Sequence, residues 1–329
     1  MQPTLDNAVV EPLKRPRIPE WIRIGLPTGR RFGRTGSVVA GLQLHTVCES
    51  ARCPNQSECW SRGTATFMIG GDRCTRACGF CAVATAKPLP LDAGEPARVA
   101  EAVRRMGLKH VVITAVARDD VSDGGAEHFA QTMRAARAAR GGELVVEVLT
   151  PDFGGRRESV ETVLVAQPDV FNHNVETVRR LTPSVRHRAT YERSLEVLRM
   201  AAELAENGRR SETAATGTAA SGCSGGLRPP HVAGSGRKIF VKSGLMAGLG
   251  ETEAEVLETM RDVRAAGCEV LTIGQYLQPT MKNLPVVEFV RPETFVRYGR
   301  AGLEMGFVHV ASGPLVRSSY HADDFEPGK

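Results

Sequence analysis

Three cysteines that could hold a metal cofactor stand close together in the segment 64–84: Cys74, Cys78 and Cys81, with the spacing C-x3-C-x2-C. They lie on a glycine-rich stretch that follows an apolar run of β character. Three thiolates on one loop can hold three corners of a 4Fe–4S cube and leave the fourth iron open to a small molecule. A structural zinc loop is the alternative, but closed zinc sites use four ligands and usually contain C-x2-C pairs. The spacing therefore favours an iron–sulfur cluster with one exchangeable corner.

A second cysteine triad precedes the first, with Cys48, Cys53 and Cys59 spaced C-x4-C-x5-C. Each triad is one ligand short of a closed zinc site, so a pair of zinc fingers is a poor explanation. A single shared zinc ion or a disulfide pair would leave thiols unaccounted for. Two cubane clusters account for all of the cysteines between positions 48 and 81.

The chain has 329 residues, a formal net charge of +5, 42% hydrophobic and 24% charged residues. This composition is typical of a globular protein large enough for one barrel or two ordinary domains. We find no run of about 18 apolar residues that could span a membrane, and the N-terminus has neither secretory nor transit character. We therefore expect a cytoplasmic protein whose eight cysteines are reduced. The small positive charge does not argue for nucleic-acid binding.

Short apolar runs alternate along the chain with stretches of helical periodicity. The expected strands are 64–70, 110–116, 144–150, 169–175, 239–247 and 270–277, and the expected helices are 95–106, 125–140, 156–167, 191–206, 252–266 and 292–305. Such alternation implies parallel pairing through right-handed crossovers. The predicted fold class is α/β, a partial (β/α)6 TIM-like barrel with extensions at both ends. Chemistry in such barrels sits at the carboxyl ends of the strands, and the first cysteine triad follows the first strand.

The barrel is expected to span 64–306, with other segments around it. Residues 1–40 are interpreted as an extended arm, and 41–63 carry the second cysteine triad. Residues 207–237 are rich in Gly, Ser, Ala and Thr, which predicts a flexible insertion. Residues 307–329 are interpreted as a tail that closes the site of the second triad.

Four single residues outside the motifs receive structural interpretations. Trp21 and Ile22 are expected to anchor the arm by packing. Cys223 lies in the predicted insertion and should be a free thiol, whereas Cys268 is expected in the core.

The chain resembles the lipoyl synthases, a family within the radical S-adenosylmethionine (SAM) superfamily. The C-x3-C-x2-C run with an aromatic residue, Phe80, before its last cysteine is similar to the superfamily signature. The family resemblance extends from about Trp21 to Ala322, apart from the insertion. It rests on CESARCPNQSEC, CTRACGFC, ITAVARDDVSDGGAEHF, FNHNVETV, KSGLMAGLGET, QYLQPT and VASGPLVRSSYHA.

The resemblance implies a radical SAM sulfurtransferase that inserts two sulfur atoms at C6 and C8 of an octanoyl chain attached to a lysine of a lipoyl carrier domain. Cys74, Cys78 and Cys81 would hold the 4Fe–4S cluster that cleaves SAM. The other triad, with Ser319 of the RSSY run as fourth ligand, would hold an auxiliary 4Fe–4S cluster that is consumed as the sulfur source.

The implied partners are an octanoylated carrier, such as an E2 subunit or the glycine cleavage H protein, an electron donor such as flavodoxin or ferredoxin, and an iron–sulfur carrier that repairs the cluster. No nucleic acid and no membrane is implied. Acid–base side chains cannot break unactivated C–H bonds. A radical made by the cofactor must therefore abstract the hydrogen atoms.

Contacts to SAM are expected from two motifs. They are a GGE-like element and the end of the fourth expected strand: Gly124, Gly125, Glu127, Asn172, Asn174 and Glu176. His173 alternates with the two asparagines and should point away and pack. Asp119 and Asp120 end the second expected strand, where they could face the active site, and loop or cap residues are the alternative interpretation.

Lys242, Ser243 and the glycines of 248–250 end the fifth expected strand and could approach SAM through their backbone. Arg317 could order the RSSY turn or meet the carrier, and a solvated arginine is the alternative.

Two departures from the family pattern are the 207–237 insertion and the run from FNHNV to YERS, which puts carrier contacts there in doubt.

Rival interpretations are a biotin synthase or methylthiotransferase, or a non-enzymatic electron carrier or zinc-dependent module. The closeness of the triads and the absence of a following β-module disfavour a methylthiotransferase, and the βα units disfavour a carrier.

Overall fold

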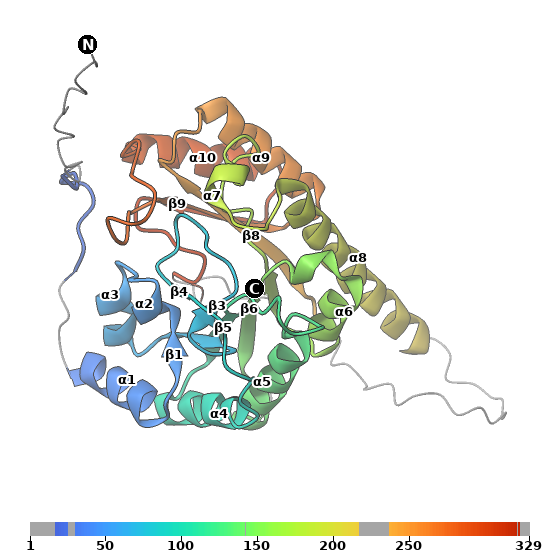
Figure 1. The fold of residues 1–329 in the computed structure, drawn as a ribbon. Coiled ribbons are helices and arrows are strands. Elements are labelled where there is room, and N and C mark those ends of the chain that lie inside the picture. The colour runs from blue at the N-terminus through green and yellow to red at the C-terminus, as the bar shows by residue number, and fades with distance from the viewer. Residues whose placement is uncertain (1–16, 26–29, 142, 217–236, 321, 323–329) are drawn as a thin grey trace, which may run out of the picture.

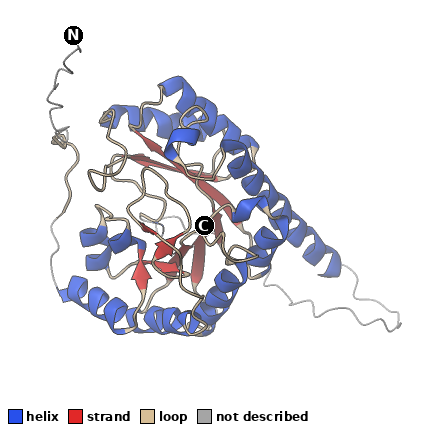
Figure 2. Ribbon diagram, in the orientation of Figure 1, coloured by secondary structure: helices blue, strands red, loops and turns tan. Residues whose placement is uncertain are grey.

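The computed structural model describes residues 17–25, 30–141, 143–216, 237–320 and 322. Its main sheet has eight strands in the order β1-β2-β5-β6-β7-β8-β9-β10 (Figure 1). Strand β1 is antiparallel to β2, and the other neighbours are parallel. Helices surround the outside of the curved sheet (Figure 2). Among the described strands no pairing joins β10 to β1, so the barrel is partial, as predicted.

The strands of the main sheet are β1 (His45–Thr46), β2 (Thr66–Ile69), β5 (His110–Ala115), β6 (Val145–Leu149), β7 (Val170–Asn172), β8 (Phe240–Ala247), β9 (Val270–Gln275) and β10 (His309–Gly313). Strands β3 (Arg73–Cys74) and β4 (Ala84–Thr85) form a separate two-stranded sheet. The helices are α1 (Arg30–Gly41), α2 (Val47–Ser50), α3 (Gln56–Arg62), α4 (Glu95–Met106), α5 (Ala126–Ala138), α6 (Arg157–Val165), α7 (Thr182–Val185), α8 (Tyr191–Thr216), α9 (Glu253–Ala265) and α10 (Pro292–Glu304), with a 3-10 turn at Phe153–Gly155.

All of the expected strands and helices are present. Helix α4 begins at Glu95, has a proline in its first turn and ends before Gly107, which has a φ of 65°. Helix α9 begins with a capping box between Thr252 and Glu255. These local signals fix element boundaries because they satisfy backbone groups at helix ends.

Three expectations about the surrounding segments are wrong in part. The extended arm predicted for 1–40 contains α1, which packs Val39 into the core. The first ten residues of the insertion predicted from 207 belong to α8, which continues to Thr216; residues 217–236, with Cys223, lie outside the described part. The predicted tail from 307 begins with β10, which adds a seventh parallel strand beside β9.

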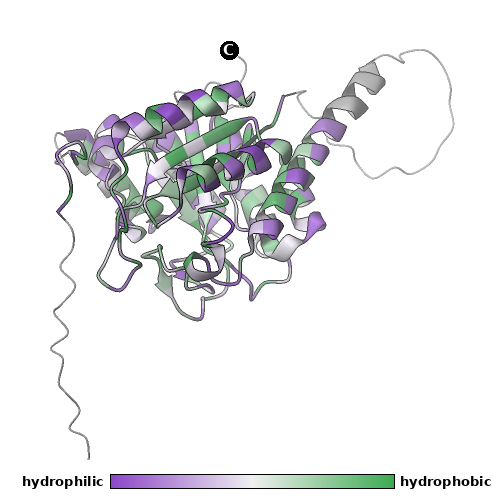
Figure 3. Ribbon diagram, turned by 90° about the horizontal axis from the view of Figure 1, so that it is seen from above, coloured by the Kyte–Doolittle hydropathy of each residue, from purple (hydrophilic) through white to green (hydrophobic). Residues whose placement is uncertain are grey.

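The core lies between the sheet and its helices. The strands are coloured as hydrophobic, whereas the helices are striped with polar residues (Figure 3). Cys268 is fully buried in this core, as predicted. Of the two anchors expected in the arm, Ile22 is buried and Trp21 is 37% exposed beneath the guanidinium of Arg291. In the described residues, no helix has the length and apolarity needed to cross a membrane.

Candidate active site

The loop that carries Cys74, Cys78 and Cys81 begins directly after β2. Gly70 and Gly71 have φ angles of 78° and 94°, which residues with a side chain rarely adopt, and they turn the chain away from the sheet. The loop then closes on itself because β3 pairs with β4, with Cys74 opposite Thr85. The short strand pair therefore holds the first cysteine in place.

Backbone bonds fasten the other end of this loop to two distant segments. The amide of Gly79 donates to the carbonyl of Val185 at 2.9 Å, and the carbonyl of Gly79 accepts from Leu284 at 2.9 Å. The side-chain amide of Asn283 donates to the carbonyl of Cys81 at 2.8 Å. A Cβ at position 79 would lie 2.8 Å from Leu284 Cγ, so a glycine is needed for this close approach.

A buried ion-pair network holds the middle of the loop. Arg76, between the first two cysteines, donates to Asp119 at 2.9 and 2.7 Å and to Asp152 at 2.7 Å. Arg193 adds a weaker contact to Asp152 at 3.4 Å. Burial alone would raise the pKa of Asp152, but the Arg76 guanidinium outweighs burial and holds that pKa well below its usual range. The loop is thus tied to the segments that follow β5 and β6.

Backbone amides point at the sulfurs of this triad, and the Val83 backbone hydrogen-bonds Cys81. The amides of Ala117 and Arg76 lie 3.3 and 3.4 Å from Cys74 Sγ, and the amide of His187 lies 3.4 Å from Cys78 Sγ. Burial, followed by the neighbouring thiols Cys78 and Cys74, raises the pKa of Cys81 to about 12. Such thiols become thiolates when a cationic centre binds them, so the donor set suits an iron–sulfur cluster.

The second triad is built on two short helices. Cys48 lies in α2, whose first turn is capped by the Thr46 hydroxyl accepting from the Glu49 amide at 3.3 Å. Cys53 follows in the connecting loop, where its amide donates to the carbonyl of Cys48 at 3.0 Å, and Cys59 lies in α3. Burial raises the pKa values of all three, to about 11 for Cys48 and about 12 for Cys59.

The chain end that follows β10 returns to this triad. A cavity is lined by the three cysteines together with Arg317, Ser319 and Tyr320. The Tyr320 hydroxyl donates to the Glu58 carboxylate at 2.9 Å, and Asn55 donates to the carbonyl of Leu315 at 2.6 Å. The structure therefore brings Ser319 and the second triad, which are far apart in sequence, to one cavity.

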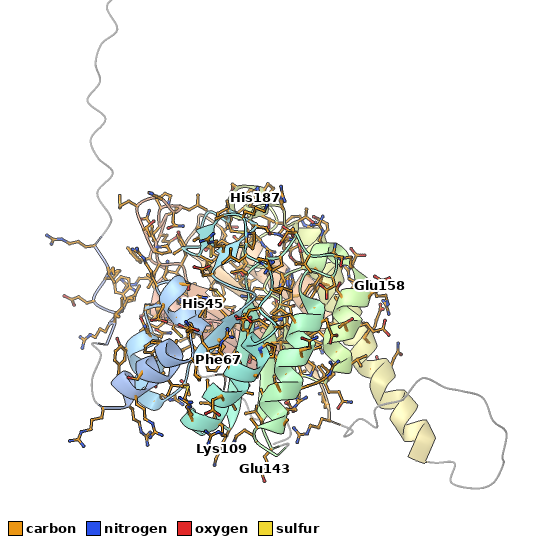
Figure 4. All side chains as sticks on the ribbon, turned by 60° about the horizontal axis from the view of Figure 1, so that its bottom comes forward. His45, Phe67, Lys109, Glu143, Glu158 and His187 are labelled. Atoms are coloured by element: carbon orange, nitrogen blue, oxygen red, sulfur yellow. The ribbon has the colours of Figure 1, made fainter. Side chains whose placement is uncertain are left out.

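The two triads lie near opposite ends of β2. Thr66 and His110, the first residues of β2 and β5, line the cavity of the second triad, whereas the first triad follows the last residue of β2. Figure 4 shows these two edges of the barrel: Lys109 lies just before β5 at one edge, and His187, which contacts the first loop, lies at the other.

The geometry disfavours a single zinc ion at either triad. Among the described residues, no three His, Cys, Asp or Glu side chains are grouped so that they could hold one metal ion. The thiols of each triad nevertheless interact electrostatically with one another. A cube whose irons each take a different cysteine needs neighbouring but separated sulfurs, so the arrangement fits a 4Fe–4S cluster at each triad.

The expected SAM contacts are distributed over several positions. Gly124 and Gly125, with φ angles of 67° and 88°, precede α5 at the carboxyl edge of the sheet. Glu127 lies on the exposed face of α5 and forms an ion pair with Arg134 at 3.2 Å. The structure thus directs the Glu127 side chain to a helix surface and does not bring it to the cysteine loop.

The polar residues after β7 have different partners. Asn172 is fully buried and donates to Glu147 at 3.0 Å, and Asn174 donates to the Ser318 hydroxyl at 2.7 Å. Glu176 is an electrostatic neighbour of Cys78 and Cys81. Burial raises its pKa above the ordinary value.

His173 is buried, as predicted, and its two ring nitrogens have partners. Nδ1 lies 2.9 Å from the carbonyl of Thr150, and Nε2 lies 3.1 Å from the hydroxyl of Ser194. Because a carbonyl only accepts, Nδ1 carries the proton and Nε2 accepts from Ser194. Arg186 donates to the same hydroxyl at 2.6 Å.

Several interpretations of single polar residues change with the structure. Asp119 binds Arg76 of the cysteine loop and Asp120 binds Arg118, so Asp119 is more than a loop or cap residue. Lys242 uses its side chain to bind Glu147 inside the barrel. Arg317 is partly buried and donates to the carbonyl of Val316 at 2.6 Å, so the fully solvated alternative is wrong.

Sequence reasoning did not find Arg76 and Asp152 as a functional pair. The available signals were an arginine inside the C-x3-C spacing and an aspartate three residues after the end of β6.

Comparisons with known proteins add a separate line of evidence. Residues 68–210 match the radical SAM superfamily, and residues 4–53 match the N-terminal domain of lipoyl synthase of the radical SAM family. A lipoyl synthase from Rubrobacter xylanophilus is 51% identical over 93% of this chain and 85% of that protein. One from Thermus thermophilus is 52% identical over 97% of this chain and 89% of that protein.

A solved structure supports the fold alone. The crystal structure of Streptococcus suis SuiB bound to precursor peptide SuiA has a TM-score of 0.51 and 10% sequence identity, covering 79% of this chain and 53% of that one.

Proposed function

The chain belongs to the lipoyl synthase family of radical SAM enzymes, and from this premise we propose that it inserts two sulfur atoms at C6 and C8 of an octanoyl chain on a lysine of a lipoyl carrier domain. It is a sulfurtransferase that uses two 4Fe–4S clusters and SAM. The observation that carries the assignment of its residues is the pair of cysteine triads near opposite ends of β2, one of which shares a cavity with Ser319.

Cys74, Cys78 and Cys81 are the proposed ligands of the SAM-binding cluster. When bound, the two clusters supply the electron that cleaves SAM and the sulfur that enters the product. Arg76 ties the first loop to Asp119 and Asp152, and backbone amides directed at the sulfurs of Cys74 and Cys78 hold these ligands in place.

Cys48, Cys53, Cys59 and Ser319 are the proposed ligands of the auxiliary cluster. A serine oxygen is a harder donor than a thiolate and matches iron of a sulfide cluster less well. Such a ligand suits an iron that must be released when the cluster gives up its sulfur. The common cavity of the four side chains supports this assignment.

For SAM, we propose contacts from Gly124, Gly125, Glu127, Asn172, Asn174 and Glu176. Glu176 has the strongest support because it is half-buried beside the thiols of the first loop. Glu127 has the weakest, because its side chain pairs with Arg134 on the helix surface. A SAM-binding measurement on Glu176→Gln and Glu127→Gln would separate the two, with the larger loss expected for Glu176.

The partners follow from the reaction. Lipoyl synthases act on lipoyl carrier proteins, and we propose an octanoylated E2 subunit or glycine cleavage H protein as the acceptor here. A flavodoxin or ferredoxin would supply electrons, and an iron–sulfur carrier would rebuild the auxiliary cluster. We place the protein in the cytoplasm because its ligand thiols need reducing conditions, and all seven described cysteines are free.

The direct test is anaerobic incubation of the reconstituted enzyme with SAM, dithionite and an octanoylated lipoyl-domain peptide, followed by mass spectrometry. We expect about eight irons per chain, from the composition of two cubes, together with 5′-deoxyadenosine and a peptide carrying two added sulfurs. Formation of 5′-deoxyadenosine without any sulfur in the peptide would refute the assigned reaction while leaving the superfamily assignment intact.

A further inference from the structure

The tail segment 314–320 runs through the interior of the barrel. A Cβ at Gly274 of β9 would lie 2.0 Å from the carbonyl oxygen of Val316, and a Cβ at Gly244 of β8 would lie 3.1 Å from the Ser318 hydroxyl. Both strands therefore carry a glycine where the tail touches them. Because Ser319 follows Ser318 directly, whatever fixes Ser318 also determines where the Ser319 side chain can reach.

A buried ion pair meets the tail at Ser318. Lys242 Nζ of β8 lies 2.8 and 3.1 Å from the two carboxylate oxygens of Glu147 of β6, and 2.6 Å from the main-chain carbonyl oxygen of Ser318. Asn172 donates to the same carboxylate at 3.0 Å. The side chains of Lys242 and Glu147 are 5% and 2% exposed.

The Lys242 ammonium group has a hydrogen-bond partner for each of its three donors only when the tail is in place. An ammonium group has three donors, and here two point to Glu147 and the third to Ser318. Removal of the tail would leave one donor of a buried charge without a partner, which is unfavourable. The ion pair and the tail therefore stabilise each other.

Asn174 supplies a second contact to the same residue. Its amide donates to the Ser318 hydroxyl at 2.7 Å, and its own side-chain oxygen is buried without a hydrogen-bond partner. The carbonyl of Ser318 is held by a charged donor and its hydroxyl by a neutral one. Charge-assisted hydrogen bonds are the stronger class, so the lysine should dominate.

We propose that Lys242, neutralised by Glu147, is a positioning residue that fixes the tail at Ser318 and thereby places Ser319 at the cavity of Cys48, Cys53 and Cys59. Lys242 itself does not line that cavity. The second half of this inference rests on the proposed function, in which Ser319 is a ligand of the auxiliary cluster. The first half, anchoring of the tail, does not.

The test compares three variants of the reconstituted enzyme, with Ser319→Ala as the spectral reference. The measurements are hydrogen exchange and the electron paramagnetic resonance (EPR) spectrum of the auxiliary cluster, recorded in a Cys78→Ala background. The first is Lys242→Met. The second, Lys242→Met with Glu147→Gln, removes the pair without leaving a buried charge and keeps an acceptor for Asn172. The control is Lys238→Met, which breaks the pair between Lys238, just before β8, and Glu269, just before β9.

We expect the double variant to fold and its amides at Val316 and Tyr320 to exchange at least about tenfold faster, because a charged hydrogen bond to the tail is lost. The auxiliary spectrum should change in the direction produced by Ser319→Ala. The control should match the parent in both measurements. If the double variant folds and its amides at Val316 and Tyr320 exchange at the parent rates, the proposal that Lys242 anchors the tail is wrong.

The measurements distinguish failure of the tail anchoring from failure of the placement of Ser319. If the tail exchanges faster but the spectrum stays that of the parent, while Ser319→Ala changes it, the anchoring does not place Ser319 and the second half is wrong. If Ser319→Ala leaves the spectrum unchanged, the proposed ligand is wrong, and the exchange rates still decide whether Lys242 anchors the tail.

Discussion

The guanidinium of Arg76 lies 2.7 Å from the carboxylate of Asp152, with the two side chains 7% and 0% exposed. Arg76 lies between the first two cysteines of the C-x3-C-x2-C loop, and Asp152 follows β6. The pair therefore fastens the cluster loop to a neighbouring strand of the barrel.

Arg76→Leu should destabilise this loop by about 3–5 kcal/mol, because it leaves the buried carboxylate of Asp152 with only the longer contact to Arg193 as an ion pair. We expect loss of about half of the iron and of SAM cleavage, while the auxiliary cluster is retained. Iron analysis and EPR spectroscopy would check this. Arg73→Gln is a matched control, since its contact with Asp72 is long, at 3.8 Å, and exposed; equal iron content in both variants would contradict the role of Arg76.

The two triads should separate in function. Cys78→Ala should abolish formation of 5′-deoxyadenosine, because one corner of the SAM-binding cluster is lost. Cys53→Ala should leave SAM cleavage measurable and block sulfur insertion. Chromatography of 5′-deoxyadenosine and mass spectrometry of the peptide give the two readouts. Equal loss of SAM cleavage in two folded variants would show that the division of labour is wrong.

Ser319→Ala should retain SAM cleavage and lose lipoyl product, because the cavity of the second triad loses its oxygen donor. Ser318→Ala should be milder, since it removes only the hydroxyl contact with Asn174 and keeps the carbonyl that Lys242 binds. Ser319→Cys should bind a cluster but release it slowly, with slow turnover. Product formation by Ser319→Ala at the parent rate would exclude the serine as a ligand.

His173 should make stability depend on pH. Burial, followed by the nearby charge of Arg186, lowers the pKa of His173 to about 4. Below pH 6.5 the unfolded chain binds a proton at this site and the folded chain does not, so stability is complete above pH 6.5 and falls as the pH drops toward 4, by about 3 kcal/mol at most.

Anaerobic denaturation curves between pH 5 and 7.5 would measure this effect. The slope of stability against pH should be smaller in His173→Gln than in the parent. An unchanged slope in His173→Gln would mean that the histidine does not remain neutral in the folded protein.

Much of the barrel could be predicted because its elements are specified locally. The boundaries of α4 follow from Glu95, its first-turn proline and Gly107. Helix α1 was missed because its glycines disfavour a helix on their own. It is stabilised by a tertiary partner: a Cβ at Gly36 would lie 3.0 Å from the ring of Trp60 in α3. No local pattern contains that contact.

The candidate site also contains one part that could be predicted from the sequence and one part that could not. The cysteine triads were visible because their ligands are neighbours in sequence. The partners of Arg76 and Lys242 were not, since Asp152 is 76 residues from Arg76 and Ser318 is 76 residues from Lys242. Pairs this distant depend on how the strands are ordered around the barrel, and a single sequence does not specify which strand ends will meet.

Strand β2 has four residues, all of them buried, and an extended strand advances about 3.3 Å per residue, so it is about 13 Å long. The thiol triads are fastened near its two ends, and the core packing around it prevents that length from changing. The length of β2 therefore sets the distance between the points at which the segments carrying the two triads join the sheet. Under the proposed function the acyl chain would be presented to both triads, and the length of β2 is then the span that this chain would have to cover.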